Sequence, residues 1–271
     1  MREMISNADN LEITRDFTEL AFYLPWKYKI TNDSNYFDNL VGDGVYYNIN
    51  NQPMSGSVHL ALGAMHMIFM GIVYNYLIIL NNAFPSEFNL TLIGFHHIIK
   101  KEMGNELSWH DFSLIPERSI LDFFRGVGMS KSDIGKFKEM VDKRNDLMHT
   151  NGVYIEDIEK FEEYSGKYLV CAEMINQKCL DSVKKLFFEF IKSIEVKFND
   201  DAEAMEYITE YFSKEYGISP RALDLLRRIK IEEYPDNLNK KLIYNGLKRY
   251  SKEWDVEIDE YFVDSMRDEL A

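Results

Sequence analysis

The sequence predicts an all-α fold, on three observations. Apolar residues recur at spacings of three and four in two long stretches, 134–148 and 161–175. Residues that start and end helices punctuate the chain, with Pro116 at a first-turn position and Gly126, Gly128 and Gly152 after helical stretches. Of the 271 residues 46% are hydrophobic and 14% aromatic, which is enough to bury a core.

The first 54 residues are the least helical part of the chain. Two runs rich in aromatic and β-branched residues, 22–28 and 45–49, are separated by turn residues such as Asp43-Gly44. We therefore expect residues 1–54 to form a short irregular and β-stranded N-terminal extension.

Residues 55–198 are predicted to form a helical bundle. Its five helices are expected at 58–82, ended by Pro85, at 86–106, at 116–125, from Ser130 or Ser132 to His149, and at 155–198.

The chain becomes more acidic after Asn199-Asp200-Asp201, and we place a boundary near residue 199. Helices are expected at 202–216, 220–231, 237–251 and 259–270, which makes 199–271 an acidic helical C-terminal region. This region is a candidate sensor, substrate gate or inhibitory lid, and the sequence does not choose among these roles.

Residues 58–80 contain no Asp, Glu, Lys or Arg over 23 residues, a length that can span a bilayer. His59, His66 and Asn75 lie inside this run and no basic cluster flanks it, so a core helix is the preferred interpretation and membrane association the alternative. The polar N-terminus has no secretion signal, and Cys171 and Cys179 lie too far apart on one helix to pair. A cytoplasmic location is expected.

The net charge of −14 argues against a protein that coats nucleic acid non-specifically. The charge is unevenly distributed, because residues 97–150 hold nine basic and nine acidic side chains. A small surface that accepts a polyanion is therefore compatible with this part of the chain.

Polar side chains continue an apolar stripe on the fourth helix. Ile134, Phe137 and Val141 are followed at the same spacing by Arg144 and Asn145. An arginine at a position that normally faces the core is costly unless another group pairs with it, so Arg144 indicates a cleft or an interface.

His149 lies four residues after Asn145, close to the expected end of this helix. The negative end of the helix dipole favours its imidazolium form and suits it to both donating and accepting a proton. On a straight helix Arg144 and His149 are about 140° apart in azimuth, so one helix does not easily aim both at one phosphate.

The segment Arg144-Asn145-x-x-x-His149 resembles the Arg-(four to six residues)-His signature of HEPN domains, including the polar residue after the arginine. The surrounding bundle, roughly 55–198, is part of this resemblance. It implies a metal-independent endoribonuclease without cofactors that dimerises to form a composite site and leaves 2′,3′-cyclic phosphate and 5′-hydroxyl ends. Arg144 and His149 would be catalytic, with Asn145 and Asp146 as accessory residues.

Other polar residues are weaker candidates. His96 and His97 point about 100° apart and have no zinc-like partners nearby, so no metal site is expected. His66 or Asn75 could line a cleft opposite Arg144.

Two alternatives to the enzyme remain. The first is a non-catalytic HEPN-like module that binds or assembles with a protein partner, and the second is a membrane-associated helical protein. For the enzyme, the resemblance implies a toxin or antiviral-defence effector with an RNA substrate, a homodimer and a regulatory partner or antitoxin, and no membrane.

Overall fold

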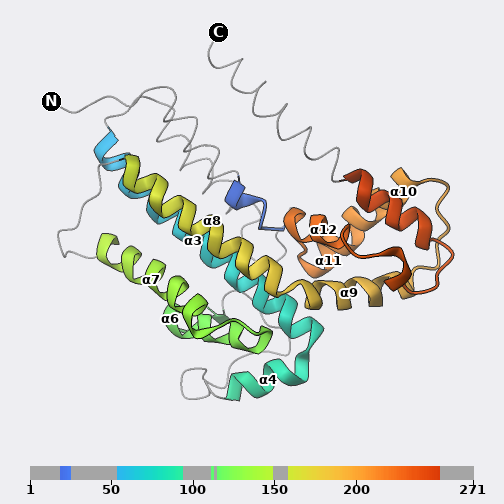
Figure 1. The fold of residues 1–271 in the computed structure, drawn as a ribbon, viewed down its shortest axis with the longest axis horizontal. Coiled ribbons are helices and arrows are strands. Elements are labelled where there is room, and N and C mark those ends of the chain that lie inside the picture. The colour runs from blue at the N-terminus through green and yellow to red at the C-terminus, as the bar shows by residue number, and fades with distance from the viewer. Residues whose placement is uncertain (1–18, 26–53, 94–110, 113–114, 149–157, 251–271) are drawn as a thin grey trace, which may run out of the picture.

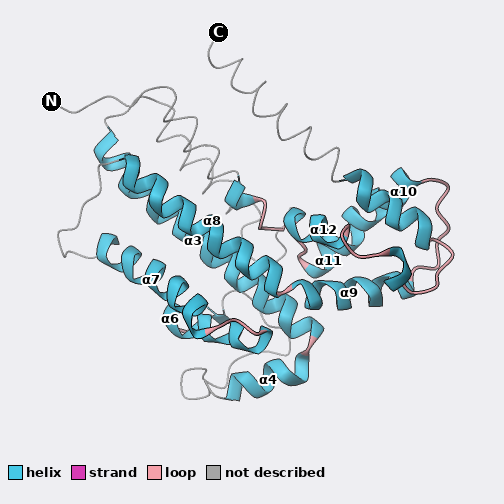
Figure 2. Ribbon diagram, viewed as in Figure 1, coloured by secondary structure: helices cyan, strands magenta, loops and turns pink. Residues whose placement is uncertain are grey.

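The computed structural model describes residues 19–25, 54–93, 111–112, 115–148 and 158–250. All regular elements within these ranges are helices, which confirms the predicted all-α fold (Figure 2). Two helices, α3 (Met54–Ala83) and α8 (Ile158–Lys178), run side by side through the middle, with α7 (Lys131–Met148) beside them (Figure 1). Where this pair ends, α4 (Pro85–Ile93) follows α3 and α9 (Leu180–Ser193) follows α8, and α9 leads into a second group of helices that ends with α12 (Pro220–Leu226) and the helix at 240–250.

Helix α3 (Met54–Ala83) is the central helix of the core. From Leu62 to Leu80 most of its apolar side chains are buried, because α4 (Pro85–Ile93), α7, α8 and α9 all pack against it. Its part Ala61–Ala83 is long and apolar enough to cross a membrane, and 78% of its apolar window is buried within the protein. Such burial is typical of the core helix of a soluble protein.

The break after α3 is sharp. The helix ends at Ala83, and Pro85, which the sequence predicted as a helix stop, is also the first residue of α4. Proline is well suited to the first helical position, because its fixed φ is already helical and it needs no N–H bond there. Beyond Ile93, the predicted second helix lies outside the described residues.

The helix predicted at 116–125 is one α-helical turn followed by a tighter helix. Pro116 precedes α6 (Glu117–Ile120), which continues as the 3₁₀ segment Leu121–Val127 and ends at Gly128, whose φ is 78°. The long α7 (Lys131–Met148) then begins with a capping box. The Ser130 hydroxyl accepts from the Asp133 N–H at 3.1 Å, and the Asp133 carboxylate accepts from the Ser130 N–H at 3.2 Å.

The single helix predicted from 155 to 198 is wrong. The structure has two helices, α8 (Ile158–Lys178) and α9 (Leu180–Ser193), with a break at Cys179. Cys179 has φ −89° and ψ 3°, so the chain leaves helical geometry for one residue. The break redirects α9, whose buried residues pack against both α3 and α12 (Pro220–Leu226).

Two of the C-terminal helices begin with side-chain caps. At the start of α10 (Asp201–Tyr207) the Asp200 side chain accepts a hydrogen bond from the Glu203 N–H. At the start of α12 the Ser219 side chain accepts one from the Ala222 N–H. The helix predicted at 202–216 contains a π-helical turn, Ile208–Ser213, before α11 (Lys214–Tyr216) ends at Gly217.

Beyond α12, a short 3₁₀ turn, Ile231–Glu233, and a helix at 240–250 complete the described part. The aromatic rings of Phe187, Phe212 and Tyr234 meet where α9 packs against this region. The boundary near residue 199 stays a prediction, and the expected helix at 259–270 lies outside the described residues.

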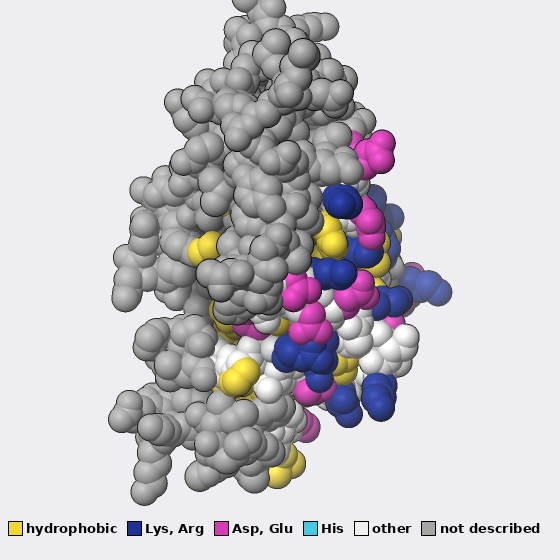
Figure 3. Space-filling model, turned by 90° about the vertical axis from the view of Figure 1, so that its left-hand side faces the viewer, with side chains coloured by type: hydrophobic (Ala, Val, Ile, Leu, Met, Phe, Trp, Pro, Cys, Tyr) yellow, Lys and Arg dark blue, Asp and Glu magenta, His cyan; other side chains and the backbone are white. Residues whose placement is uncertain are grey.

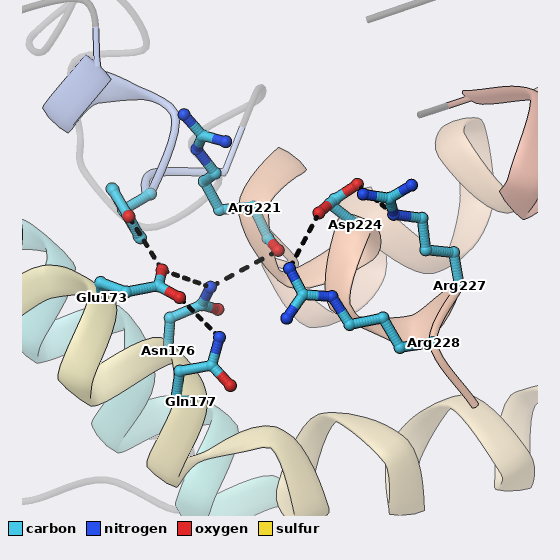
Figure 4. A network of polar contacts seen from close by, with 8 residues as sticks. Glu173, Asn176, Gln177, Arg221, Asp224, Arg227 and Arg228 are labelled. Carbon is cyan, nitrogen blue, oxygen red and sulfur yellow. Dashed lines mark hydrogen bonds and ion pairs between the residues drawn. The ribbon is translucent and has the colours of Figure 1, made fainter. Parts of the chain in front are cut away.

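The short N-terminal segment 19–25 contacts α8 and α12. The Tyr23 hydroxyl donates to Glu173 on α8 at 2.9 Å, and Arg221 on α12 donates to Glu19 at 2.6 Å. Figure 4 shows Arg221 pointing towards this segment, while Glu173 also accepts from Asn176. Residues 22–25 form a turn and coil rather than the start of the predicted strand, and the rest of the 1–54 extension lies outside the described residues.

Candidate active site around Arg144

Arg144 lies one turn before the end of α7, on the side that faces the bundle. The preceding stripe residues Phe137 and Val141 are buried, and the Arg144 side chain is only 26% exposed. The sequence placed Arg144 at a position of this kind and required a partner for its charge.

That partner is Glu117, in the first turn of α6. Nη2 of Arg144 donates a hydrogen bond to Oε2 of Glu117, whose side chain is 25% exposed. The same carboxylate oxygen lies 3.2 Å from Nε2 of His66 on α3. On the far side of the His66 ring, Nδ1 lies 2.9 Å from the hydroxyl of Tyr168 on α8.

The protonation states in this chain follow from burial. Burial lowers the pKa of His66 and outweighs the opposing effect of Glu117, so the imidazole is neutral at pH 7. Burial alone would raise the pKa of Glu117, but the hydrogen bonds from His66 and Arg144 and the positive charge of Arg144 outweigh it and lower this pKa. Glu117 is therefore an anion that can only accept hydrogen bonds.

These states fix the direction of the hydrogen bonds. Burial raises the pKa of Tyr168, so its hydroxyl keeps its proton and donates to Nδ1 of His66. The neutral imidazole then carries its proton on Nε2 and donates it to Glu117. The reverse tautomer would place a nitrogen lone pair against the carboxylate.

The resulting chain, Tyr168–His66–Glu117–Arg144, ties four helices together, namely α8, α3, α6 and α7. The rings of Phe69 and Phe137 pack beside it, with centroids 6.1 Å apart, and Phe69 also contacts Tyr168 at 5.4 Å. A guanidinium has five N–H donors, and within the described part of the chain Glu117 is the one acceptor found for Arg144. The Glu117 carboxylate thus engages Nη2 and orients the Arg144 guanidinium.

The other predicted site residues can be located only in part. Asn145 is partly exposed and Asp146 is exposed, both on α7. His149 lies outside the described residues, so its distance from Arg144 stays untested. Of the two residues expected opposite Arg144, His66 reaches it through Glu117, whereas the buried Asn75 donates instead to the Gly217 carbonyl at 2.8 Å.

Sequence reasoning missed Glu117 and Tyr168. A carboxylate in the first turn after Pro116 is ordinary at a helix start, and that role gave no reason to assign it to Arg144, 27 residues later. The core-facing position of Arg144 could have pointed to such a residue, because a half-buried arginine requires an acidic partner, here from another helix.

The surface at the end of the bundle where α7 and α8 lie is mixed in charge. Figure 3 shows Lys and Arg side chains interspersed with Asp and Glu on this side. Exposed ion pairs on α6, α7 and α8, such as Arg118–Asp142 and Lys167–Glu163, also join side chains of opposite charge. A phosphate bound nearby would therefore depend on a few oriented donors rather than on a broad basic surface.

No group of three or more His, Cys, Asp or Glu residues suited to a metal ion occurs among the described residues. Comparison with protein-family models, with curated proteins and with solved structures gave no match. The function of this chain is therefore inferred from the residues around Arg144.

Proposed function

We propose that this protein is a metal-independent endoribonuclease of the HEPN type, with Arg144 and His149 as its catalytic residues. The observation that supports the proposal best is the orientation of Arg144 by a carboxylate that two other helices hold in place. A guanidinium fixed in advance of binding can stabilise charge that develops on a phosphate without reorganising during the reaction.

Each residue of the motif has a separate task in the reaction. The N–H groups of Arg144 that do not face Glu117 contact the non-bridging oxygens of the scissile phosphate. His149 removes the proton of the ribose 2′-hydroxyl or protonates the leaving 5′-oxygen. The 2′-oxygen attacks phosphorus and the bond to the 5′-oxygen breaks, which leaves a 2′,3′-cyclic phosphate and a 5′-hydroxyl. Asn145 orients the histidine or a phosphate oxygen, and Asp146 is an accessory residue.

A homodimer completes the site in this proposal. Because Arg144 and His149 diverge by about 140° on one straight helix, two chains can supply converging side chains more easily than one. The ends of two α7 helices would face each other across the RNA. A toxin or antiviral-defence role, with a protein that regulates the enzyme, is the biological setting that the motif implies.

One observation favours a second function, a HEPN-like module that binds a protein partner without catalysis. The hydrogen-bond chain from Tyr168 to Arg144 pairs the arginine charge internally, so Arg144 has a structural role that needs no substrate. In this case Arg144 stabilises the bundle, and partner binding rather than RNA cleavage is the function.

The two functions are distinguished by incubating the purified protein with total tRNA and a structured messenger RNA in the presence of EDTA. Wild type is compared with Arg144→Ala and His149→Ala, and the ends of the products are mapped. Arg118→Ala is the matched control, because Arg118 is an exposed arginine paired with Asp142 on α7. Circular dichroism verifies that each variant folds.

Cleavage that leaves 5′-hydroxyl ends, is lost in both motif variants and persists in Arg118→Ala is the expected result. If wild type stays inert even with cell extract supplied as activator, the enzyme proposal fails. Partner binding that survives His149→Ala would then support the module.

A further inference from the structure

A second site lies at the opposite end of α7 from Arg144. It is an open cavity of about 430 Å³ lined by the end of α3, by α4, by the 3₁₀ segment 121–127 and by the junction of α8 and α9. Small-molecule sites in proteins usually have volumes of ~300–1,000 Å³. The cavity lies near the start of α7, because Gly126 and Val127 line it. Arg144 is 13 residues after the first residue of α7, or about 20 Å along the helix, so the cavity is separate from the candidate active site.

The floor of the cavity is apolar and rich in aromatic rings. Phe88 and Phe123, which are both buried, contact each other with centroids 5.4 Å apart, and Leu80, Phe84 and Val127 complete this surface. A surface of this kind accepts a flat aromatic group by dispersion and by edge or offset ring contacts.

The rim of the cavity is polar and its charge is unbalanced. Two carboxylates, Glu87 and Asp181, stand against one ammonium group, that of Lys178. Within the described part of the chain, neither carboxylate has an ion-pair partner, whereas Lys178 is close enough to the carboxyl group of Asp133 to lower its pKa. The Lys185 ammonium group does not line the cavity; it donates to the Ala83 carbonyl oxygen and lies 4.5 Å from the centre of the Phe84 ring. The lining itself is net negative, which favours a cation over a phosphate, as does the overall charge of −14.

A buried hydroxyl adds a directional group. Ser182 on α9 is 1% exposed and lines the cavity. Among the described residues no hydrogen-bond partner of its hydroxyl is found, although buried polar groups are nearly always paired. A ligand N–H group in the cavity would supply that partner.

We propose that this cavity binds an arylalkyl ammonium ion, with its ring on the phenylalanine floor and its ammonium group between Glu87 and Asp181. The ring supplies contact area and the carboxylates supply selectivity for a cation over an anion of the same shape. The proposal does not depend on RNA cleavage, so its outcome is independent of Arg144 and His149.

The experiment uses tryptamine as the probe and indole-3-propionate as its anionic counterpart of similar shape. Both are titrated at pH 7 into the full chain carrying labelled methyl groups, with NMR as the readout. Saturable shifts of the Leu80 and Val127 methyl signals by tryptamine, and weak or no shifts by the anion, are expected.

Charge removal gives the second test. The double variant Glu87→Gln, Asp181→Asn alters two exposed side chains and should weaken tryptamine binding about tenfold or more. Glu189→Gln, an exposed carboxylate on α9 that does not line the cavity, should bind as wild type does. The proposal is overturned if neither methyl signal responds, if both probes bind equally, or if the double variant binds tryptamine as tightly as the control.

Discussion

Replacing Glu117 by Gln tests the role of the carboxylate that links His66 to Arg144. Glutamine keeps the shape of the side chain and one acceptor oxygen, but it loses the charge and leaves the Arg144 guanidinium without a counter-ion. Breaking a fully buried pair costs about 3–5 kcal/mol and breaking an exposed pair about 0–1 kcal/mol. Because Glu117 and Arg144 are 25% and 26% exposed, we expect a loss of about 2 kcal/mol of unfolding free energy.

The assay is urea unfolding followed by circular dichroism, with thermal unfolding as a second readout. A loss of about 2 kcal/mol corresponds to a fall in Tm of about 4–8 °C for a domain of this size. Asp142→Asn is the matched control, because it also removes a carboxylate that pairs with an arginine between α6 and α7. In that pair both side chains are 50% exposed, and the variant should be nearly as stable as wild type.

A double-mutant cycle with Arg144→Met isolates the interaction itself. If Glu117 and Arg144 stabilise each other, the two substitutions together should cost about 1–2 kcal/mol less than the sum of their separate effects. Additive effects, or a Glu117→Gln variant as stable as Asp142→Asn, would refute the argument that this carboxylate holds the arginine.

Three further predictions concern stability and use urea unfolding. The pKa of His66 is lowered in the folded protein. Below pH 6.5 the imidazole is therefore protonated in the unfolded chain while it is still neutral in the folded protein. Unfolding free energy should therefore decrease as pH falls from 7 to 5, by at most about 1.4 kcal/mol per pH unit from this group, and an equal pH slope in His66→Asn would contradict this origin. Gly246→Ala should destabilise by about 1–3 kcal/mol, because the new Cβ would lie 2.7 Å from the Asp201 carbonyl oxygen, whereas Gly166→Ala meets nothing within 4 Å and should stabilise α8 by about 0.5–1 kcal/mol. Tyr76→Phe removes the donor 2.5 Å from the buried Asn176 amide oxygen and should cost about 1–3 kcal/mol, and a loss below 0.5 kcal/mol, on the order of an ordinary surface change, would contradict it.

The sequence was sufficient for α7 and for the start of α12, because local chemistry marks both starts. The helix expected at 220–231 ends earlier, at Leu226. Ser130 and Asp133 cap α7, and Ser219-Pro220 begins α12. The break at Cys179 was not predictable in the same way, because no glycine or proline marks it and the apolar spacing continues across it. Tertiary packing of α9 between α3 and α12 decides that geometry.

Of the candidate site, the sequence predicted the arginine but not the carboxylate that pairs with it. Periodicity placed Arg144 towards the core, but the acceptor came from α6 and its support from α3 and α8. Contacts between helices that are distant in sequence depend on how the bundle packs. The spacing of apolar residues within one helix shows which face is buried, but not which residues of other helices lie against it. His66 was a candidate because a charged or polar group in an apolar run needs a partner.

The contacts of the N-terminal segment have a consequence for synthesis. Glu19 pairs with Arg221, 202 residues later, and Tyr23 bonds Glu173, 150 residues later. At ~5–20 residues per second, a ribosome needs about 10–40 s to make the chain between Glu19 and Arg221. The contact with Glu173 can form before the contact with Arg221, and the segment is fully docked only after the ribosome has made α12.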